Sequence, residues 1–183
     1  KSTLLSLIYG LMDWQSGEII FDGEKLFGPK GNLVPGESKM KFVAQNYDLM
    51  PYGSVYDNVG KYISNINLTS KKEKVDELLD IVGLTEYAKV IPKNLSGGQQ
   101  QRVAIARGLV NRPPMILADE PTAPLDSVRA MAVIRILNDM AKRYDTAVIV
   151  VTHDEKIIPT FKRIYHIREG VTYEEMGEGR GFE

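Results

Sequence analysis

The sequence predicts an α/β fold in which a mostly parallel sheet is flanked by helices. Short apolar runs that suit buried strands alternate with longer stretches that suit helices, most clearly in the second half of the chain. These runs are apolar at successive positions, which is typical of strands buried on both faces. With 183 residues, of which 43% are hydrophobic and 26% charged, the chain is long enough for a single domain, 1–183, with its own core.

The composition excludes several classes of function. The net charge is -1, so nothing indicates electrostatic capture of nucleic acid, and we expect no nucleic-acid partner. The absence of cysteine excludes disulfides and thiolate metal sites. No apolar run approaches the roughly 20 residues that a membrane-spanning helix needs, so any membrane role has to come through a partner.

The first elements are a helix and two strands. Residues 3–12 are rich in leucine and predict a helix packed against a sheet. Residues 17–23 predict a short strand closed by the turn-forming pair Asp22–Gly23. A loop follows, and residues 41–45 predict a further strand with the polar Gln45 at its end.

Residues 46–95 have a different character and predict a helical subdomain inserted into the α/β core. Ser70 to Glu73 has the pattern of a capping box, and Gly83 is well placed to end the helix that follows. Apolar residues recur in between at helical spacing: Val75, Leu78, Leu79 and Val82. Gln45 and Ser96 lie too close in the sequence for a long coiled-coil insertion.

The remainder returns to alternating elements. We predict a helix over about 97–110, a strand over 115–119, a helix over about 127–143 and a strand over 146–152. The segment 169–183 is rich in Gly and Glu and is expected to be an exposed, partly mobile tail.

Two neighbouring motifs indicate nucleotide chemistry. In the segment 95–102, Gly97 and Gly98 directly precede a predicted helix and leave backbone N–H groups open to an anion. The apolar strand that follows ends in Asp119 and Glu120, which is how a buried strand delivers carboxylates to a metal–phosphate site. A phosphate cradle close to a metal/base pair points to nucleotide hydrolysis.

The first three residues match the second half of a phosphate-binding loop, G-x-x-x-x-G-K-[ST]. Alone this match is weak, and capping of a helix is the ordinary role of Ser2 and Thr3. The later motifs favour the functional interpretation, in which Lys1 reaches the β- and γ-phosphates, Ser2 binds Mg²⁺ and Thr3 adds a contact to the α-phosphate. We accordingly expect the chain to be a fragment, truncated within this loop at its N-terminus.

Together these motifs resemble those of the ATP-binding cassette (ABC) ATPases over essentially the whole chain. The signature of the family corresponds to residues 95–99 and its Walker B strand to 115–120. Gln45 matches the Q-loop, Asp126 the D-loop and His153 the switch histidine. The resemblance implies a P-loop NTPase fold that binds ATP and Mg²⁺.

The resemblance also implies a role for each residue. Because Asp119 and Glu120 are neighbours in a strand, their side chains point in opposite directions and need different roles: Asp119 in the Mg²⁺ shell and Glu120 polarising the hydrolytic water. Gln45 would touch both the metal and the attacking water, and His153 would contact the γ-phosphate. The alternatives are a surface glutamine at a strand end and a structural histidine, the role expected of His166.

A second phosphate cradle within one subunit is redundant, and the family resolves this by pairing head to tail. The signature, Ser96 to Gln99, would close on the ATP held by a second ABC ATPase domain. Asp126, in the D-loop 122–126, would reach across the same dimer. Pro124 departs from the small residue that is commonest at its position and stiffens this loop.

The function implied is that of an ATPase subunit that powers transport across a membrane through partner transmembrane permease subunits. It would dock through the segment 46–95 and the Q-loop, and lie in the cytoplasm at the inner face of the cell membrane. The fragment alone is expected to hydrolyse ATP weakly or not at all. The alternatives are a soluble, non-transport ABC ATPase acting on ribosomes or DNA, and a non-catalytic interaction module, which the retained motif residues disfavour.

The direction of transport is left open because the two halves of the chain resemble different subfamilies. The stretch 49–59 resembles the ATPases of polyamine and iron importers. Residues 117–122 and 163–170 are more similar to the lipoprotein-release and macrolide-efflux type.

Overall fold

The computed structural model describes residues 1–32, 34, 36–123 and 125–179. The α-helices are α1 (Ser2–Ile8), α2 (Val55–Val59), α3 (Leu68–Ile81), α4 (Gly97–Leu109) and α5 (Ser127–Tyr144). The strands are β1 (Ile20–Phe21), β2 (Glu24–Lys25), β3 (Met40–Val43), β4 (Met115–Asp119), β5 (Ala147–Val151), β6 (Arg163–Arg168) and β7 (Val171–Met176). Single turns of 3-10 helix occur at η1 (Gly60–Tyr62), η2 (Thr85–Tyr87), η3 (Pro92–Asn94) and η4 (Ile158–Thr160).

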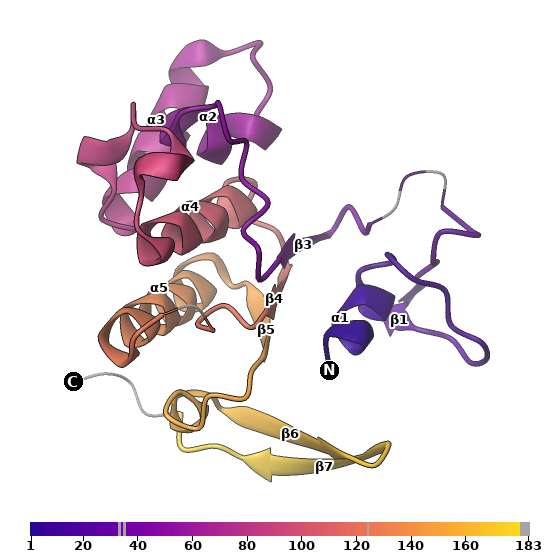
Figure 1. Cartoon of the computed structure of the whole chain (residues 1–183). Helices are drawn as coiled ribbons and strands as arrows, with labels where there is room; N and C mark the ends of the chain where they lie inside the picture. Colours follow the sequence, from indigo (N-terminus) through magenta and orange to yellow (C-terminus); the bar gives the residue numbers. More distant parts are fainter. Residues whose placement is uncertain (33, 35, 124, 180–183) are drawn as a thin grey trace.

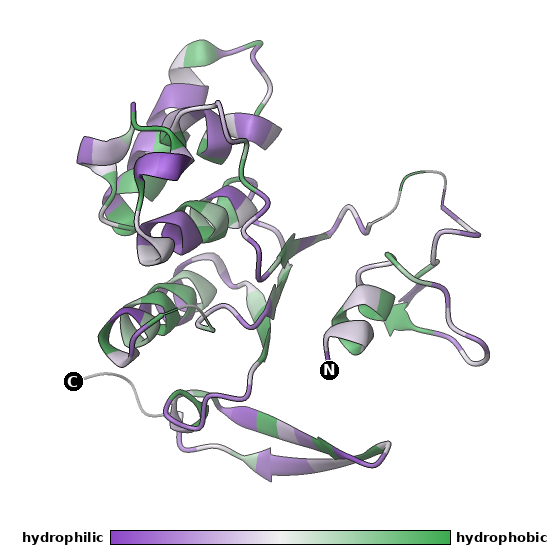
Figure 2. Cartoon of the chain, viewed as in Figure 1, coloured by the Kyte–Doolittle hydropathy of each residue, from purple (hydrophilic) through white to green (hydrophobic). Residues whose placement is uncertain are grey.

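A parallel sheet in the order β3-β4-β5 forms the centre of the molecule (Figure 1). Its register pairs Val43 with Ala118, and Asp119 with Val151. The strand β4 is apolar and buried up to Asp119, as expected for a central parallel strand, whereas β5 is apolar but only partly buried. Figure 2 shows the hydrophobic colour of this central sheet. Because all three strands run the same way, the residues that follow them meet at one edge of the sheet.

The two faces of this sheet are covered differently. Leu117 packs on one side with Leu5, Leu26 and Met40, beneath α1. Its neighbours in β4 point the other way, since side chains alternate along a strand, and join a much larger core that includes buried residues of α4 and α5. Figure 1 shows α1 on one side of the sheet and both α4 and α5 on the other.

Between β3 and α4 the described elements are all helical: α2, η1, α3, η2 and η3, which lie against α4 (Figure 1). The predicted capping box at Ser70 is wrong, because α3 begins at Leu68 and Asn67 accepts the capping hydrogen bond from the Ser70 amide. Gly83, with a φ of 64°, ends this helix as expected. The treatment of 46–95 as a separate subdomain stays a prediction.

The two ends of the chain form antiparallel pairs. Asp22 and Gly23 both have positive φ, 51° and 76°, and join β1 to β2 as a tight hairpin. The helix predicted over 3–12 ends at Ile8, and Gly10 follows with a φ of 78°. The segment 169–183, expected to be an exposed and partly mobile tail, is exposed along β7 but is not without structure there, because β7 pairs with β6 along its whole length; residues 180–183 lie outside the described part.

None of the helices in the described part of the chain has the length and apolar content needed to cross a membrane.

Candidate active site

The start of α1 is tied to the ends of two sheet strands. Ser2 Oγ donates a hydrogen bond to Asp119 Oδ1 at 2.9 Å, at the end of β4. Lys1 Nζ donates to the carbonyl oxygen of Thr152 at 3.1 Å, one residue beyond β5. The sequence-predicted metal residues Ser2 and Asp119 are therefore brought into direct contact. Thr3 lies exposed in the first turn of the same helix.

Glu120 lies immediately beyond β4 in the left-handed region, with a φ of 47°, which is uncommon for a residue with a side chain. Its amide donates to the carbonyl of Val151 at 2.9 Å and extends the pairing with β5. Its Oε1 lies 2.9 Å from Nδ1 of His153. The Glu120 side chain is 15% exposed and that of His153 75%, so the pair joins a largely buried carboxylate to an accessible imidazole.

The second carboxylate oxygen of Glu120, Oε2, is buried and has no hydrogen-bond partner among the residues that the structure describes. Buried polar atoms are normally paired, so an orphaned carboxylate oxygen indicates a place for a ligand or a water. The hydroxyl of Thr122 is orphaned in the same way. Both residues line one cavity.

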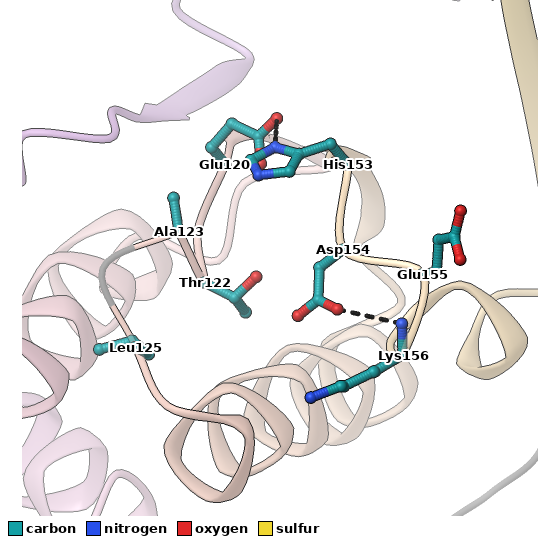
Figure 3. Close-up of a pocket in the computed structure, with 8 residues that line it drawn as sticks. All are labelled: Glu120, Thr122, Ala123, Leu125, His153, Asp154, Glu155 and Lys156. Atoms are coloured by element: carbon teal, nitrogen blue, oxygen red, sulfur yellow. Dashed lines mark hydrogen bonds and ion pairs between the residues drawn. The ribbon is translucent and has the colours of Figure 1, made fainter.

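This cavity has a volume of about 380 Å³. It is lined by Glu120, Thr122, Ala123, Leu125, His153, Asp154, Glu155 and Lys156 (Figure 3). In Figure 3 the side chains of Glu120 and His153 point toward one another at one end of it. The cavity therefore brings together the residues after β4 and the residues after β5.

Gln45 lies two residues beyond β3 and is exposed. Val43 pairs with Ala118, and Gln45 and Glu120 each follow two residues later, so both lie beyond the same end of the sheet.

The residues at this edge fit a magnesium ion bound together with phosphate. Within the described ranges, no group of three or more His, Asp or Glu side chains could hold a metal by itself. Mg²⁺ is commonly held by one or two protein ligands plus substrate phosphates and water. The adjacent hydroxyl of Ser2 and carboxylate of Asp119 supply that kind of donor set.

The signature residues form a separate structure at the start of α4. Ser96 accepts a hydrogen bond from the Gln99 amide, and the Gln99 side chain accepts one from the Ser96 amide at 2.8 Å, which completes a capping box. Gly97 and Gly98 form the first turn of α4. The helices α4 and α1 cover opposite faces of the sheet (Figure 1). Between described residues, no hydrogen bond joins the signature residues at the start of α4 to Glu120 or His153.

Asp126 caps α5 by accepting from the Arg129 amide at 3.0 Å, and it also pairs with the Arg129 guanidinium at 3.2 Å. Pro124, in the same predicted D-loop, lies outside the described residues. His166 contacts Glu175 at 2.8 Å across the β6–β7 hairpin, the structural role expected of it.

Sequence reasoning placed Thr122 in the D-loop but gave no signal that its orphaned hydroxyl lines the cavity. It missed Arg107 altogether. Arg107 is buried on α4, and a charged residue within the apolar run 103–110 was a signal that could have found it.

Comparison with known proteins identifies relatives over most of the chain. The matching family model is described as "ABC transporter" and covers residues 1–123. The putative hemin import ATP-binding protein HrtA of Staphylococcus epidermidis is 37% identical, over 93% of this chain and 78% of its own length. The lipoprotein-releasing system ATP-binding protein LolD of Acinetobacter baylyi is 36% identical, over 93% of this chain and 77% of its own. The macrolide export ATP-binding/permease protein MacB of Syntrophobacter fumaroxidans is 37% identical over 97% of this chain, which spans 26% of that longer protein.

Solved structures match as well. A dimeric ATP-binding cassette in a post-hydrolysis state, bound to ADP and Pi, superposes with a TM-score of 0.80 at 34% identity and covers 99% of this chain and 81% of its own. A dimeric bacterial ABC transporter cassette gives a TM-score of 0.81. The predicted fold class and family are confirmed. The chain belongs to the ABC transporter family, as one of its ATP-binding, ATP-hydrolysing proteins.

Proposed function

We propose that ATP is hydrolysed at the carboxyl edge of the sheet, with Glu120 as the residue that activates water. The observation that carries this assignment is the orphaned Oε2 of Glu120, buried beside the cavity while Oε1 is engaged by His153. A carboxylate with one oxygen held and the other free is placed to accept a proton from a water without turning away. The strained backbone of Glu120 supports the same role, since such strain gathers at functional sites.

The start of α1 would hold the nucleotide. Lys1 would leave the Thr152 carbonyl for the β- and γ-phosphates, which are stronger acceptors for an ammonium. Ser2 and Asp119 would share a Mg²⁺ ion, which supplies positive charge to the phosphate oxygens during phosphoryl transfer. Thr3, next along the same helix, would contact the α-phosphate.

Two further residues would complete the site. His153 is exposed at the mouth of the cavity and would meet the γ-phosphate while its Nδ1 stays on Glu120. Gln45, which follows the neighbouring strand at the same end of the sheet, would reach the metal and the attacking water.

The start of α4 would serve the ATP of a second copy paired head to tail. Two features support this arrangement: α4 lies on the face of the sheet opposite α1, and the first turn of α4 begins with Gly97 and Gly98, whose backbone N–H groups have no partner within the helix. The two solved relatives described above are dimers. Asp126 would reach across the same interface.

The partners in transport would be membrane permease subunits, with this chain at the cytoplasmic face of the membrane. MacB, whose name joins an ATP-binding and a permease function, contains a segment similar to this chain in a longer protein. The segment 46–95 would supply the docking surface. Relatives of nearly equal identity are named for import and for release or export, so we assign the choice of cargo to the permease. These transport names favour this role over a ribosome- or DNA-directed ATPase.

The test is the substitution Glu120→Gln in the full-length protein, measured by phosphate release and by retention of ATP on gel filtration. We expect kcat to fall by at least about 100-fold while ATP binding and dimerisation survive, because only the proton acceptor is lost. Glu175→Gln is the matched control, since it breaks the other His–Glu pair, on the β6–β7 hairpin, and should leave kcat unchanged. Turnover near the parent rate in Glu120→Gln would refute the assignment.

A further inference from the structure

Arg107 is a buried charge with an unusual set of partners. It lies near the end of α4 and is 7% exposed. Its Nη1 donates to the carbonyl oxygen of Asp48 at 2.6 Å and its Nη2 to that of Tyr47 at 2.8 Å. No carboxylate pairs with it in the described part of the chain. Burying a guanidinium is unfavourable unless its N–H donors are well satisfied. The two carbonyl oxygens satisfy part of this requirement, and the question is what the molecule gains from placing the charge here.

The two carbonyls belong to the turn that directly follows Gln45. Tyr47 and Asp48 both adopt left-handed backbone, with φ of 62° and 45°. The Asp48 amide bonds back to the carbonyl of Asn46 at 2.7 Å, so the chain reverses tightly here. Two consecutive non-glycine residues in this region persist only where the surroundings hold them, and the fork of Arg107 grips both.

The same turn contacts α4 a second time, at its other end. The hydroxyl of Tyr47 lies so near Gly97 that a Cβ added there would be 3.4 Å from it. Side chains on a helix lean toward its N-terminus, so Arg107 reaches back along α4 toward the turn. The turn after Gln45 thus lies against the first turn of α4 at Gly97 and is hydrogen-bonded to the other end of this helix by Arg107.

We propose that Arg107 is a positioning residue that fixes Gln45 to α4. Its fork holds the left-handed turn, and the turn sets where the chain enters and leaves Gln45. Gln45 and the signature turn Ser96 to Gln99 then move as one unit with α4. This inference rests on the proposed function, in which Gln45 serves this chain's own ATP and the start of α4 serves the partner's. Arg107 would therefore link the two ATP sites of the dimer without touching either nucleotide.

The test is a double-mutant cycle on ATPase activity in the full-length protein, using Arg107→Lys and Gln45→Ala. A lysine keeps the charge but cannot grip two carbonyls at once, so we expect kcat to fall about tenfold with KM for ATP changed less than about twofold. In the Gln45→Ala background the same substitution should lower kcat by less than about twofold, because its effect acts through Gln45.

Arg102→Lys is the matched control. Arg102 also lies on α4, and its Nη1 donates to a single carbonyl, that of Val82, at 2.8 Å. Its effect on kcat should be the same with and without Gln45. Equal effects of Arg107→Lys in both backgrounds would overturn the proposal. So would a variant that fails to fold, since the fork would then serve the fold and not the placement of Gln45.

Hydrogen exchange of the backbone separates this proposal from the role assigned to Gln45. Arg107→Lys should speed exchange of the amides of Tyr47 and Asp48 at least about tenfold while the amides of α4 keep their protection. One result would separate the two: kcat unchanged in Gln45→Ala, together with fast exchange at the turn in Arg107→Lys. The catalytic role of Gln45 would then be wrong, while the conclusion that Arg107 holds the turn would be supported. Unchanged exchange at the turn in Arg107→Lys would overturn the proposal that Arg107 holds the turn.

Discussion

The proposed function places phosphate at the N-terminal ends of two helices, α1 and α4, and these two ends are built in different ways. At α1, Lys1 makes no capping hydrogen bond, and the side chains of Lys1 and Ser2 reach outward to the ends of β5 and β4. At α4, Ser96 and Gln99 satisfy each other in a capping box. The N-terminal end of α1 is hydrogen-bonded to the ends of two sheet strands, whereas the capping bonds at the N-terminal end of α4 lie within that end itself.

The hydrophobic cores on which the two helices pack also differ, in size. Leu5 and three other buried residues form the core beneath α1, whereas α4 belongs to a core that extends through α2, α3 and α5. The N-terminal end of α1, held by a small core and by polar contacts, can adjust its position to a nucleotide. The N-terminal end of α4, held by a large core, keeps its position before any ligand binds, which suits a surface that closes on a ligand held by another subunit.

The largest expected difference between the two starts is in nucleotide binding by a single chain. Lys1→Ala should weaken ATP binding about 100-fold, because it removes the cation proposed to face the phosphates. Ser96→Ala should leave binding to the monomer within about twofold, because Ser96 is proposed to serve the partner's nucleotide. Titration calorimetry at concentrations below dimerisation measures both. Equal losses of ATP affinity in the two variants would contradict the proposed difference between α1 and α4.

The next difference is in stability. Leu109 and Leu5 are both fully buried, the first in the large core and the second in the small one. Leu109→Ala should lower the free energy of unfolding by about 3–4 kcal/mol, and Leu5→Ala by about 2–3 kcal/mol, since a small core beside open surface can relax around the lost volume. Urea denaturation compares the two. A larger loss for Leu5→Ala would contradict the packing argument.

The smallest difference is in capping. Ser96→Ala should lower the free energy of unfolding by about 1 kcal/mol, because it removes the hydroxyl that caps α4. Ser2→Ala should change stability by less than about 0.5 kcal/mol while reducing ATPase activity, because its exposed hydroxyl contacts Asp119 and caps nothing. Thermal unfolding together with phosphate release would show whether stability and activity separate in this way.

The sequence was a good guide where apolar runs and motif order decide the structure. The strands predicted over 115–119 and 146–152 lie within a residue of β4 and β5, because continuous apolar runs indicate parallel strands, although β5 is only partly buried. It was a poor guide to β7, whose exposed residues give no burial pattern and are paired only through the register with β6. The site residues could be placed at strand ends. The contact between Glu120 and His153, and the fork of Arg107, depend on side-chain reach across elements and could not.

The mixing of two defective chains tests most directly the claim that the two starts serve different ATP molecules. Both chains carry Glu120→Gln, so that ATP is retained; one also carries Lys1→Ala and the other Gly97→Asp. An aspartate fits at Gly97, where the nearest atom would be 3.4 Å from its Cβ, and is favourable in a first turn, but it repels phosphate. We predict that neither chain alone retains ATP in a dimer, and that an equimolar mixture retains one ATP per mixed dimer, at its single intact composite site. A mixture that retains no more ATP than either chain alone would contradict the account.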